Sequence, residues 1–413
     1  MPGLRAQDRR PRCDSAPDGA AHNGRMPTPD PHPQPSTVRL FAPLTLRSVR
    51  LRNRVLISPM QQYAAQDGMA NDWHLIHLAR FALGGAGAVF VGATAVEPRG
   101  RNTHGDLGLW DDVQIAPLAR VAQTLRAQGA VPAIQLGHTG RKAGLQRWWE
   151  GHGCLGAADA ARGEGPWPVV GPSALPTGPG WPVPEALSEA AIAQLLQAWG
   201  QAARRAHAAG FEMLEVHGAH GYLIHQFLSP VANQRDDDWG GDAPRRMRFA
   251  WAVAEAVRQH WPAHLPLSWR LSLADLDDGS LALPQLMDLV RGLQARGVDL
   301  IDASSGGGIS SYPAQLQQRA GGLEFRAEVG AQIRQQTGMP VLAVGHITDP
   351  QQAEDLLQQG QADAVALGRE ALHNPNWAVH AELALGHQNG FASWPRAYRM
   401  WLARRAGQSP SPR

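Results

Sequence analysis

The stretch Glu215–Pro230, EVHGAHGYLIHQFLSP, joins the end of an apolar run to a turn that carries polar side chains. The apolar run, residues 213–216, predicts a short buried strand that ends at His217. His220 and Tyr222 follow within a turn that contains glycine. Imidazoles can donate hydrogen bonds to a carbonyl or nitro oxygen, and a phenol can release a proton. Because α/β enzymes place their chemistry at the carboxyl ends of strands, we interpret this stretch as the centre of an active site.

The two histidines also admit simpler interpretations. Together with His225 they could supply three zinc ligands, but an H-x-x-H spacing alone is a weak metal signal, and we predict no metal. One histidine taken alone could be a satisfied core residue. Two imidazoles and a phenol within six residues favour a functional cluster instead.

Composition excludes several classes of protein. The chain has 413 residues, of which 43% are hydrophobic and 18% charged, which is typical of a globular α/β protein. Its net charge of +2 gives no reason to expect a nucleic-acid partner. No apolar run reaches membrane-spanning length, so we expect no membrane association. The two cysteines, Cys13 and Cys154, have no motif spacing, which excludes a disulfide framework and fits the cytoplasm.

The first 37 residues differ from the rest of the chain. They are rich in Pro, Asp, Arg and Ala without periodicity, which predicts a disordered N-terminal extension, and Met26 is an alternative start. We expect residues 38–413 to form one domain, which opens with a hairpin before Asn53.

Within that domain, eight apolar runs alternate with helical patterns. The expected strands begin at Val55, Ala88, Val131, Met213, Leu267, Leu300, Val341 and Ala364. The expected helices span residues 73–83, 114–128, 188–209, 243–260, 283–295, 324–336, 349–359 and 375–385. Eight βα units over roughly 340 residues predict a (β/α)8 TIM barrel. A doubly wound open sheet is the alternative, but no G-x-G-x-x-G follows the first strand.

The segment 138–187, between the third and fourth expected strands, is long and rich in Gly, Pro and Trp. We interpret it as a capping excursion over the barrel mouth. Its tryptophans could line an apolar lid or simply pack the excursion onto the barrel. They are Trp148, Trp149, Trp167 and Trp181.

The carboxyl ends of the other strands supply a second group of residues, which a barrel would gather at one pocket. Gly345 and Gly368 follow the last two strands, and Arg369 adds a guanidinium group, so that N–H groups and a charge could meet a phosphate. Each glycine taken alone is explained by the backbone conformation that a tight turn requires. Arg270 could lie beside an electron-rich ring, and Gln135 could bond the polar edge of a heterocycle. Together these residues predict a phosphorylated planar cofactor across the barrel mouth.

The same positions resemble the Old Yellow Enzyme family, and within it the thermophilic-like NADPH dehydrogenases and xenobiotic reductases. The resemblance runs from about Leu40 to Tyr398, and its most specific block is H-x-x-H-G-Y-L-x-x-x-F-L-S-P, starting at His217. The other matching segments are SPM (58–60), QLGH (135–138), GRK (140–142), N-x-R (233–235), GG (240–241), Arg270 and GR (368–369).

What the resemblance implies is a TIM barrel that holds non-covalent FMN and uses NADPH or NADH as reductant. The implied activity is that of an ene-reductase, which passes a hydride through the flavin to the β carbon of an enone, maleimide or nitroalkene. His217 and His220 would hold the substrate oxygen, and Tyr222 would supply the proton. The matching substrate positions are Tyr63, His217, His220 and Tyr222. The matching FMN positions are Ser58, Pro59, Met60, Gln61, Ala93, Gln135, Arg270, Gly345, Gly368 and Arg369.

The implied partners are small-molecule activated alkenes or quinones, with a homodimer or homotetramer as the assembly. Three departures stand against the family pattern. Gln61 occupies a position that is often a cysteine in this branch, so we expect a different flavin potential. Arg245 replaces the Asn that usually precedes Arg246. The tail 394–401 does not match the segment through which an arginine reaches a neighbouring subunit.

Other functions fit parts of the same pattern. A quinone or nitro-compound reductase could use the same scaffold, whereas a metal-dependent barrel hydrolase would contain zinc or manganese. A non-enzymatic flavin-binding barrel would keep the cofactor and turn nothing over. Dienoyl-CoA reductases and amine dehydrogenases carry a further domain and cysteine-ligated iron–sulfur clusters, for which two distant cysteines are too few.

Overall fold

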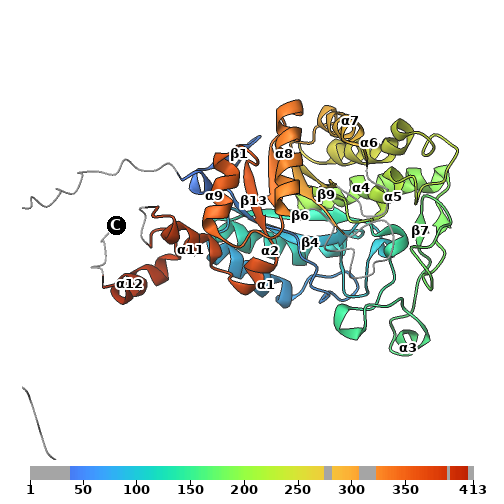
Figure 1. Cartoon of the computed structure of the whole chain (residues 1–413). Helices are drawn as coiled ribbons and strands as arrows, with labels where there is room; N and C mark the ends of the chain where they lie inside the picture. Colours follow the sequence, from blue (N-terminus) through green and yellow to red (C-terminus); the bar gives the residue numbers. More distant parts are fainter. Residues whose placement is uncertain (1–37, 274–280, 307–321, 388–390, 408–413) are drawn as a thin grey trace, which may run out of the picture. The chain divides into compact units, whose positions relative to one another are not determined.

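The computed structural model describes residues 38–273, 281–306, 322–387 and 391–407 (Figure 1). The extension 1–37, predicted to be disordered, lies outside the described residues, as do Gly307 and Gly308 after the sixth barrel strand.

Eight parallel strands close into a barrel, so the predicted TIM-barrel fold is confirmed (Figure 1). Neighbours along the chain pair in sequence, and β13 returns to pair with β3 through Val365 and Val55. A two-residue strand, β5 (Leu107–Gly108), extends the sheet beside β4. The barrel strands are β3 (Val55–Ile57), β4 (Ala88–Ala95), β6 (Val131–Gly137), β9 (Met213–Gly218), β10 (Leu267–Ser272), β11 (Leu300–Ser304), β12 (Val341–Val344) and β13 (Ala364–Leu367).

Helices with apolar stripes cover the outside of the barrel, each close to its predicted range. They are α1 (Asp72–Leu83), α2 (Ile115–Ala127), α4 (Glu189–Ala208), α6 (Ala243–His260), α7 (Leu283–Ala295), α8 (Leu323–Thr337), α9 (Pro350–Gln358) and α11 (Trp377–Ala384). Capping side chains define where several begin. Ser188 accepts a hydrogen bond from the N–H of Ala191 and Asp242 from that of Arg245, while Asp349 caps α9.

Several short elements have no strong periodic signal. An antiparallel hairpin, β1 (Leu44–Leu46) and β2 (Val49–Leu51), precedes the barrel, as expected. Helices α5 (Leu223–Leu228) and α10 (Arg369–His373) lie directly after strands β9 and β13. Helix α12 (Arg396–Arg405) contains no buried residue and exposes Tyr398, Met400 and Trp401.

The excursion 138–187 contains only short elements: η4 (Gly140–Lys142), η5 (Trp148–Glu150), α3 (Ala157–Ala160), β7 (Val170–Gly171) and β8 (Glu185–Ala186). It contacts the loops that follow the first two barrel strands. The indole N–H of Trp148 donates to the hydroxyl of Tyr63, and that of Trp167 donates to the carbonyl of Arg99. Trp148 and Trp149 remain largely exposed, so neither is a simple core residue.

The interior of the barrel changes character along its axis. Its lower part is packed with apolar side chains on the same strand faces as Gln135, Glu215 and Asp302 but two positions earlier, namely Ala133, Met213 and Leu300, which have no exposed surface. Toward the carboxyl ends, buried polar and charged side chains replace them. These are Gln135, Glu215, Ser268, Arg270, Asp302 and Ser304.

The segment after β3 depends on a glycine in the neighbouring strand. A Cβ atom at Gly92 would lie 2.6 Å from the carbonyl oxygen of Met60. We expect Gly92→Ala to displace the Ser58–Met60 segment and to lower the free energy of unfolding by about 1–3 kcal/mol, as in other overpacked sites. Urea denaturation measures this change. Gly156→Ala, where a Cβ would meet no atom within 4 Å, is the control and should change stability by less than about 0.5 kcal/mol.

Candidate active site

The turn after strand β9 brings the three predicted catalytic side chains together. The ring centroid of His217 lies 4.9 Å from that of His220 and 4.8 Å from that of Tyr222. The backbone of His220 has a φ of +59°, an uncommon value for a residue other than glycine, and its N–H donates to Ser272 Oγ at 3.0 Å. This turn therefore holds an unfavourable backbone conformation that keeps both imidazoles beside the phenol.

The hydrogen bonds of the imidazoles define where their protons lie. Burial, followed by the positive charge of Arg270, lowers the pKa of both His217 and His220, so both rings are neutral at pH 7. His217 Nδ1 accepts from the N–H of Ala219 at 3.3 Å, which leaves the ring proton on Nε2. That Nε2–H donates to His220 Nδ1 at 3.2 Å, and His220 Nε2–H in turn donates to Ser304 Oγ at 2.9 Å. Both rings therefore carry their donor on Nε2.

Two tyrosines lie near this cluster, and their hydroxyl groups have different surroundings. The hydroxyl of Tyr63 accepts from Trp148 and lies 3.4 Å from Gln61 Oε1, to which it can donate. The hydroxyl of Tyr222 has no hydrogen-bond partner among the described residues. Burial raises the pKa of both phenols, to about 12 for Tyr63, so both keep their protons at neutral pH.

Arg270 enters the mouth from strand β10. Its guanidinium group donates to Ser58 Oγ at 3.2 Å and to Ser304 Oγ at 3.3 Å, and its Nε lies 3.6 Å from Asp302 Oδ2. Gln135 lies deeper on the neighbouring side of the barrel, where its amide N–H donates to Glu215 Oε1 at 2.8 Å.

A cavity of about 550 Å³ extends from the imidazole of His220 across the ends of the last strands. Ser58, Pro59, Met60, His220 and Arg270 line its inner end, and Gly345, Gly368 and Arg369 line its outer end. Of the residues that the sequence predicts, His220, Arg270, Gly345, Gly368 and Arg369 thus share one cavity, whereas His217, Tyr222 and Gln135 do not line it. Cations and strand-end glycines at one end and polar side chains at the other fit a phosphorylated planar group such as FMN.

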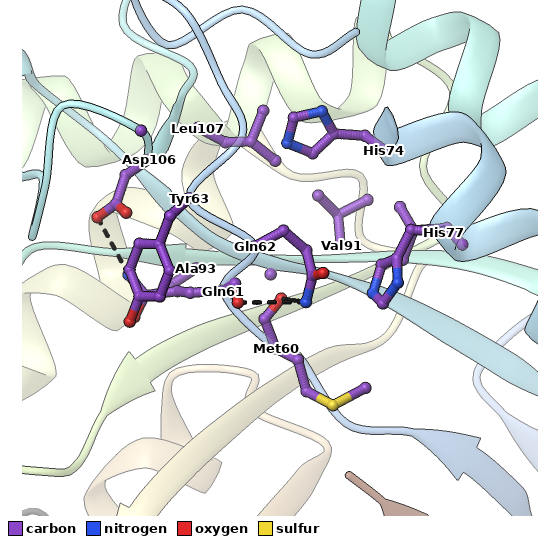
Figure 2. Close-up of a pocket in the computed structure, with 13 residues that line it drawn as sticks. Met60, Gln61, Gln62, Tyr63, His74, His77, Val91, Ala93, Asp106 and Leu107 are labelled. Atoms are coloured by element: carbon purple, nitrogen blue, oxygen red, sulfur yellow. Dashed lines mark hydrogen bonds between the residues drawn. The ribbon is translucent and has the colours of Figure 1, made fainter. Parts of the chain in front are cut away.

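A second pocket lies beside the first, around Gln61 and Ala93 (Figure 2). Figure 2 shows Asp106, Tyr63 and Gln61 on one side of this pocket and His74 and His77 on the other. The amide N–H of Gln61 donates to Asp106 Oδ2 at 3.0 Å. Asp106 also accepts hydrogen bonds from the backbone N–H groups of Asn102 and Thr103. Because burial outweighs these donors, the pKa of Asp106 is raised to about 6.

Several residues of the site were not predicted. Arg326 comes from helix α8, lines the large cavity, and donates to Ser305 Oγ at 2.8 Å and to the carbonyl of Gly345 at 3.3 Å. An arginine four residues into a helix carries no sequence signal for a strand-end pocket. Glu215 and Asp302 could have been noticed, because each is a carboxylate inside an apolar strand run.

The structure also bears on the alternatives. Within the part of the chain that the structure describes, no three His, Cys, Asp or Glu side chains are grouped to hold a metal ion. His225 Nδ1 accepts from the N–H of Gly221 and does not join His217 and His220 as a third ligand. No described helix is both long and apolar enough to cross a membrane.

A TIM barrel with neutral imidazoles and a phenol at its carboxyl end, beside a cavity suited to a phosphorylated planar group, defines a flavin-dependent oxidoreductase by class. Comparison with known proteins agrees. Residues 39–388 match the model of the NADH:flavin oxidoreductase / NADH oxidase family. The chain is 38% identical to the NADPH dehydrogenase of Geobacillus thermodenitrificans over 349 residues, which cover 84% of this chain and 94% of the relative. Identity to the NADPH dehydrogenase of Bacillus subtilis is 36%, covering 82% and 93%.

Among solved structures, morphinone reductase superposes with a TM-score of 0.69 at 28% identity, covering 85% of this chain and 91% of that chain. A further morphinone reductase structure, in complex with tetrahydroNAD, has a TM-score of 0.65 and covers 84% and 90% at 27% identity. The chain belongs to the NADH:flavin oxidoreductase / NADH oxidase family, and the resemblance to the Old Yellow Enzyme family is confirmed. It is an FMN-dependent oxidoreductase that uses NAD(P)H.

The hydrogen bonds of Gln61 generate a prediction about the flavin. A thiol at this position could not bridge Tyr63 and Asp106 as the carboxamide does. We expect Gln61→Cys to change the flavin midpoint potential and the rate of reoxidation by oxygen, as measured by anaerobic redox titration and stopped-flow absorbance. Gln62→Cys is the matched control, since the amide of Gln62 bonds only the backbone carbonyls of Met60 and Gln61 among the described residues. Identical potentials for the native protein and Gln61→Cys would contradict the expectation.

Proposed function

We propose that this chain is an ene-reductase, which reduces the double bond of an enone, maleimide or nitroalkene at the expense of NAD(P)H. Bound FMN would supply the redox chemistry by accepting a hydride from the nicotinamide and passing it to the alkene. The observation that carries the proposal is that two neutral imidazoles, both protonated on Nε2, lie beside a phenol whose hydroxyl has no partner among the described residues.

The cofactor would be held by residues along the large cavity. Gly345, Gly368 and Arg369 provide N–H groups and a charge for the phosphate. Ser58–Met60 and Arg270 line the inner end, where the flavin ring would lie, and Gln61 and Ala93 line the adjoining pocket. Gln135, whose amide donates to Glu215, would contact the ring from deeper in the barrel.

The imidazoles would bind and polarise the substrate. A carbonyl or nitro oxygen placed between His217 and His220 would receive the Nε2–H donors that now bond His220 and Ser304. Negative charge develops on this oxygen during hydride addition at the β carbon, and donors fixed in advance stabilise that charge. Neutral imidazoles suit this task because they bind the oxygen without fixing a full counter-charge in a buried site.

Tyr222 is the proposed proton donor to the α carbon, and Tyr63 is proposed to position the substrate. The hydroxyl of Tyr222 is free to turn toward substrate, whereas the hydroxyl of Tyr63 is engaged by Trp148 and Gln61. Burial raises the pKa of Tyr222, so its proton leaves only when a strongly basic carbon forms beside it.

Quinones and nitro compounds are the second proposed substrate class, because their oxygens offer the same acceptors to the imidazoles. A homodimer or homotetramer remains a proposal as well, and the exposed aromatic side chains of α12 would suit a contact between subunits.

The purified protein itself tests the proposal. We expect it to be yellow with an oxidised flavin spectrum, to bleach on anaerobic addition of NADPH, and to regain its colour on addition of cyclohexenone or a maleimide. Cyclohexene, which has no activating oxygen, is the control and should leave the protein bleached. Protein that takes up no flavin would refute the proposal, and protein that bleaches but is restored by no activated alkene would be a different reductase.

Replacing each of the two tyrosines by phenylalanine tests which phenol donates the proton. We expect Tyr222→Phe to slow reoxidation by cyclohexenone about 10²- to 10⁴-fold, the usual contribution of a positioned acid. Reoxidation by a quinone should be much less affected, because its oxygens can take protons from water. Tyr63→Phe is the matched control, with a smaller effect expected on the same half-reaction. Stopped-flow absorbance of the pre-reduced enzyme measures both, and equal effects of the two substitutions would remove Tyr222 from the role of acid.

A further inference from the structure

Two carboxyl groups that the proposed mechanism does not use lie inside the barrel. Glu215 is on strand β9 and Asp302 on strand β11, and Arg270 lies on β10 between them. The register places Glu215 opposite Ser268 and Asp302 opposite Arg270. Neither carboxyl group has any exposed surface, so water cannot solvate a charge on either.

The two groups have few hydrogen-bond donors around them. Glu215 accepts from the amide of Gln135 at 2.8 Å and from Ser268 Oγ at 3.3 Å. Neither oxygen of Asp302 accepts a hydrogen bond within the described residues, and its closest cationic atom is Arg270 Nε at 3.6 Å. Such surroundings do not stabilise two full negative charges.

The charges that face Glu215 and Asp302 also indicate that the two carboxyl groups are not both ionised. Arg270 is the guanidinium group inside the barrel, and Arg326 acts on Asp302 from helix α8 at the rim. His217 and His220, on the same strand end as Glu215, are neutral. Burial, followed by the charge of Asp302, raises the pKa of Glu215 to about 8, and burial raises that of Asp302 as well. One guanidinium group inside the barrel therefore balances one carboxylate, and the second carboxyl group keeps its proton.

We propose that Glu215 and Asp302 share one proton beside Arg270, and that two-electron reduction of the bound flavin makes the pair hold this proton more tightly. The second half rests on the proposed function, since it requires FMN beside Arg270. Hydride transfer from NAD(P)H would add one negative charge to bound FMN, and that charge would compete with the two carboxyl groups for Arg270. At a pH where the oxidised protein has lost this proton, a proton taken from water onto the pair would offset the added charge, and it would return to water when the hydride leaves for the alkene. The substrate's own proton still comes from Tyr222, so electrons and protons balance over the cycle.

The shared proton can be observed without the cofactor. We expect the infrared spectrum at pH 7, with or without FMN, to contain the carbonyl stretch of a protonated carboxyl group, shifted in heavy water and lost as the pH rises through about 8. Both Glu215→Gln and Asp302→Asn should abolish this band, because the remaining carboxylate is then balanced by Arg270. Glu354→Gln, which removes a buried carboxyl group on α9, should keep it.

A band that survives in both variants, or is absent from the native protein, overturns the proposal. If Asp302→Asn fails to fold, the pH titration of the native band and the Glu215→Gln variant, whose carboxamide can still accept from Gln135, decide the matter.

The coupling to the flavin has its own readout. With oxidised flavin the pair is deprotonated above about pH 8, and with reduced flavin its pKa is higher, so reduction takes up one extra proton between these two values. Outside that window the reduction takes up one proton per two electrons, and inside it the reduction should take up two. The slope of the midpoint potential against pH should therefore double inside the window. Glu215→Gln should remove the break, and an unbroken native slope overturns the coupling. Protein that shows the infrared band but binds no FMN would support the shared proton and refute the proposed function.

Discussion

The guanidinium group of Arg270 is the charge around which the carboxyl end of this barrel is arranged. It is 8% exposed, so it must find its partners within the protein. Its hydrogen bonds reach Ser58 at the end of the first barrel strand and Ser304 at the end of the sixth, and Asp302 lies against its Nε. One side chain thus ties together strand ends that are more than two hundred residues apart in the chain. Burial, followed by this charge, lowers the pKa of both imidazoles of the site, so that they can donate to an oxygen as neutral groups.

The fold could be predicted almost completely from the sequence, for a simple reason. Strands buried on both faces read as continuous apolar runs, and the helices that cover them read as amphipathic patterns, so that eight alternations point to one closed architecture. Elements without that periodicity could not be found this way. Helix α5 is buried along its whole length and therefore has no exposed face to contrast with a buried one, whereas α12 has no buried residue and therefore no apolar stripe facing a core.

The residues of the site can likewise be divided into those that a sequence pattern predicts and those that it does not. Residues at strand ends could be predicted together, because barrel closure brings Gln135, His217, Arg270 and Gly345 to one mouth whatever the loops do. Arg326 arrives from a helix, Asp106 from the loop before β5, and Trp148 from the excursion, and no spacing in the sequence relates them to the strand ends. Their place depends on how loops fold over the barrel, which is decided by packing and hydrogen bonding rather than by local pattern.

Those loop residues give physical meaning to the glutamine found where this branch often has a cysteine. Gln61 offers an N–H to Asp106 and a carbonyl to Tyr63, and Tyr63 in turn accepts the indole N–H of Trp148. A chain of hydrogen bonds therefore runs from a buried carboxylate, past the expected flavin edge, to an exposed tryptophan of the excursion. A thiol is too short and too weak a donor to make both contacts, so the carboxamide and the tryptophan-bearing excursion depend on each other. The same chain occupies the hydroxyl of Tyr63 and so leaves Tyr222 as the phenol free to meet a substrate.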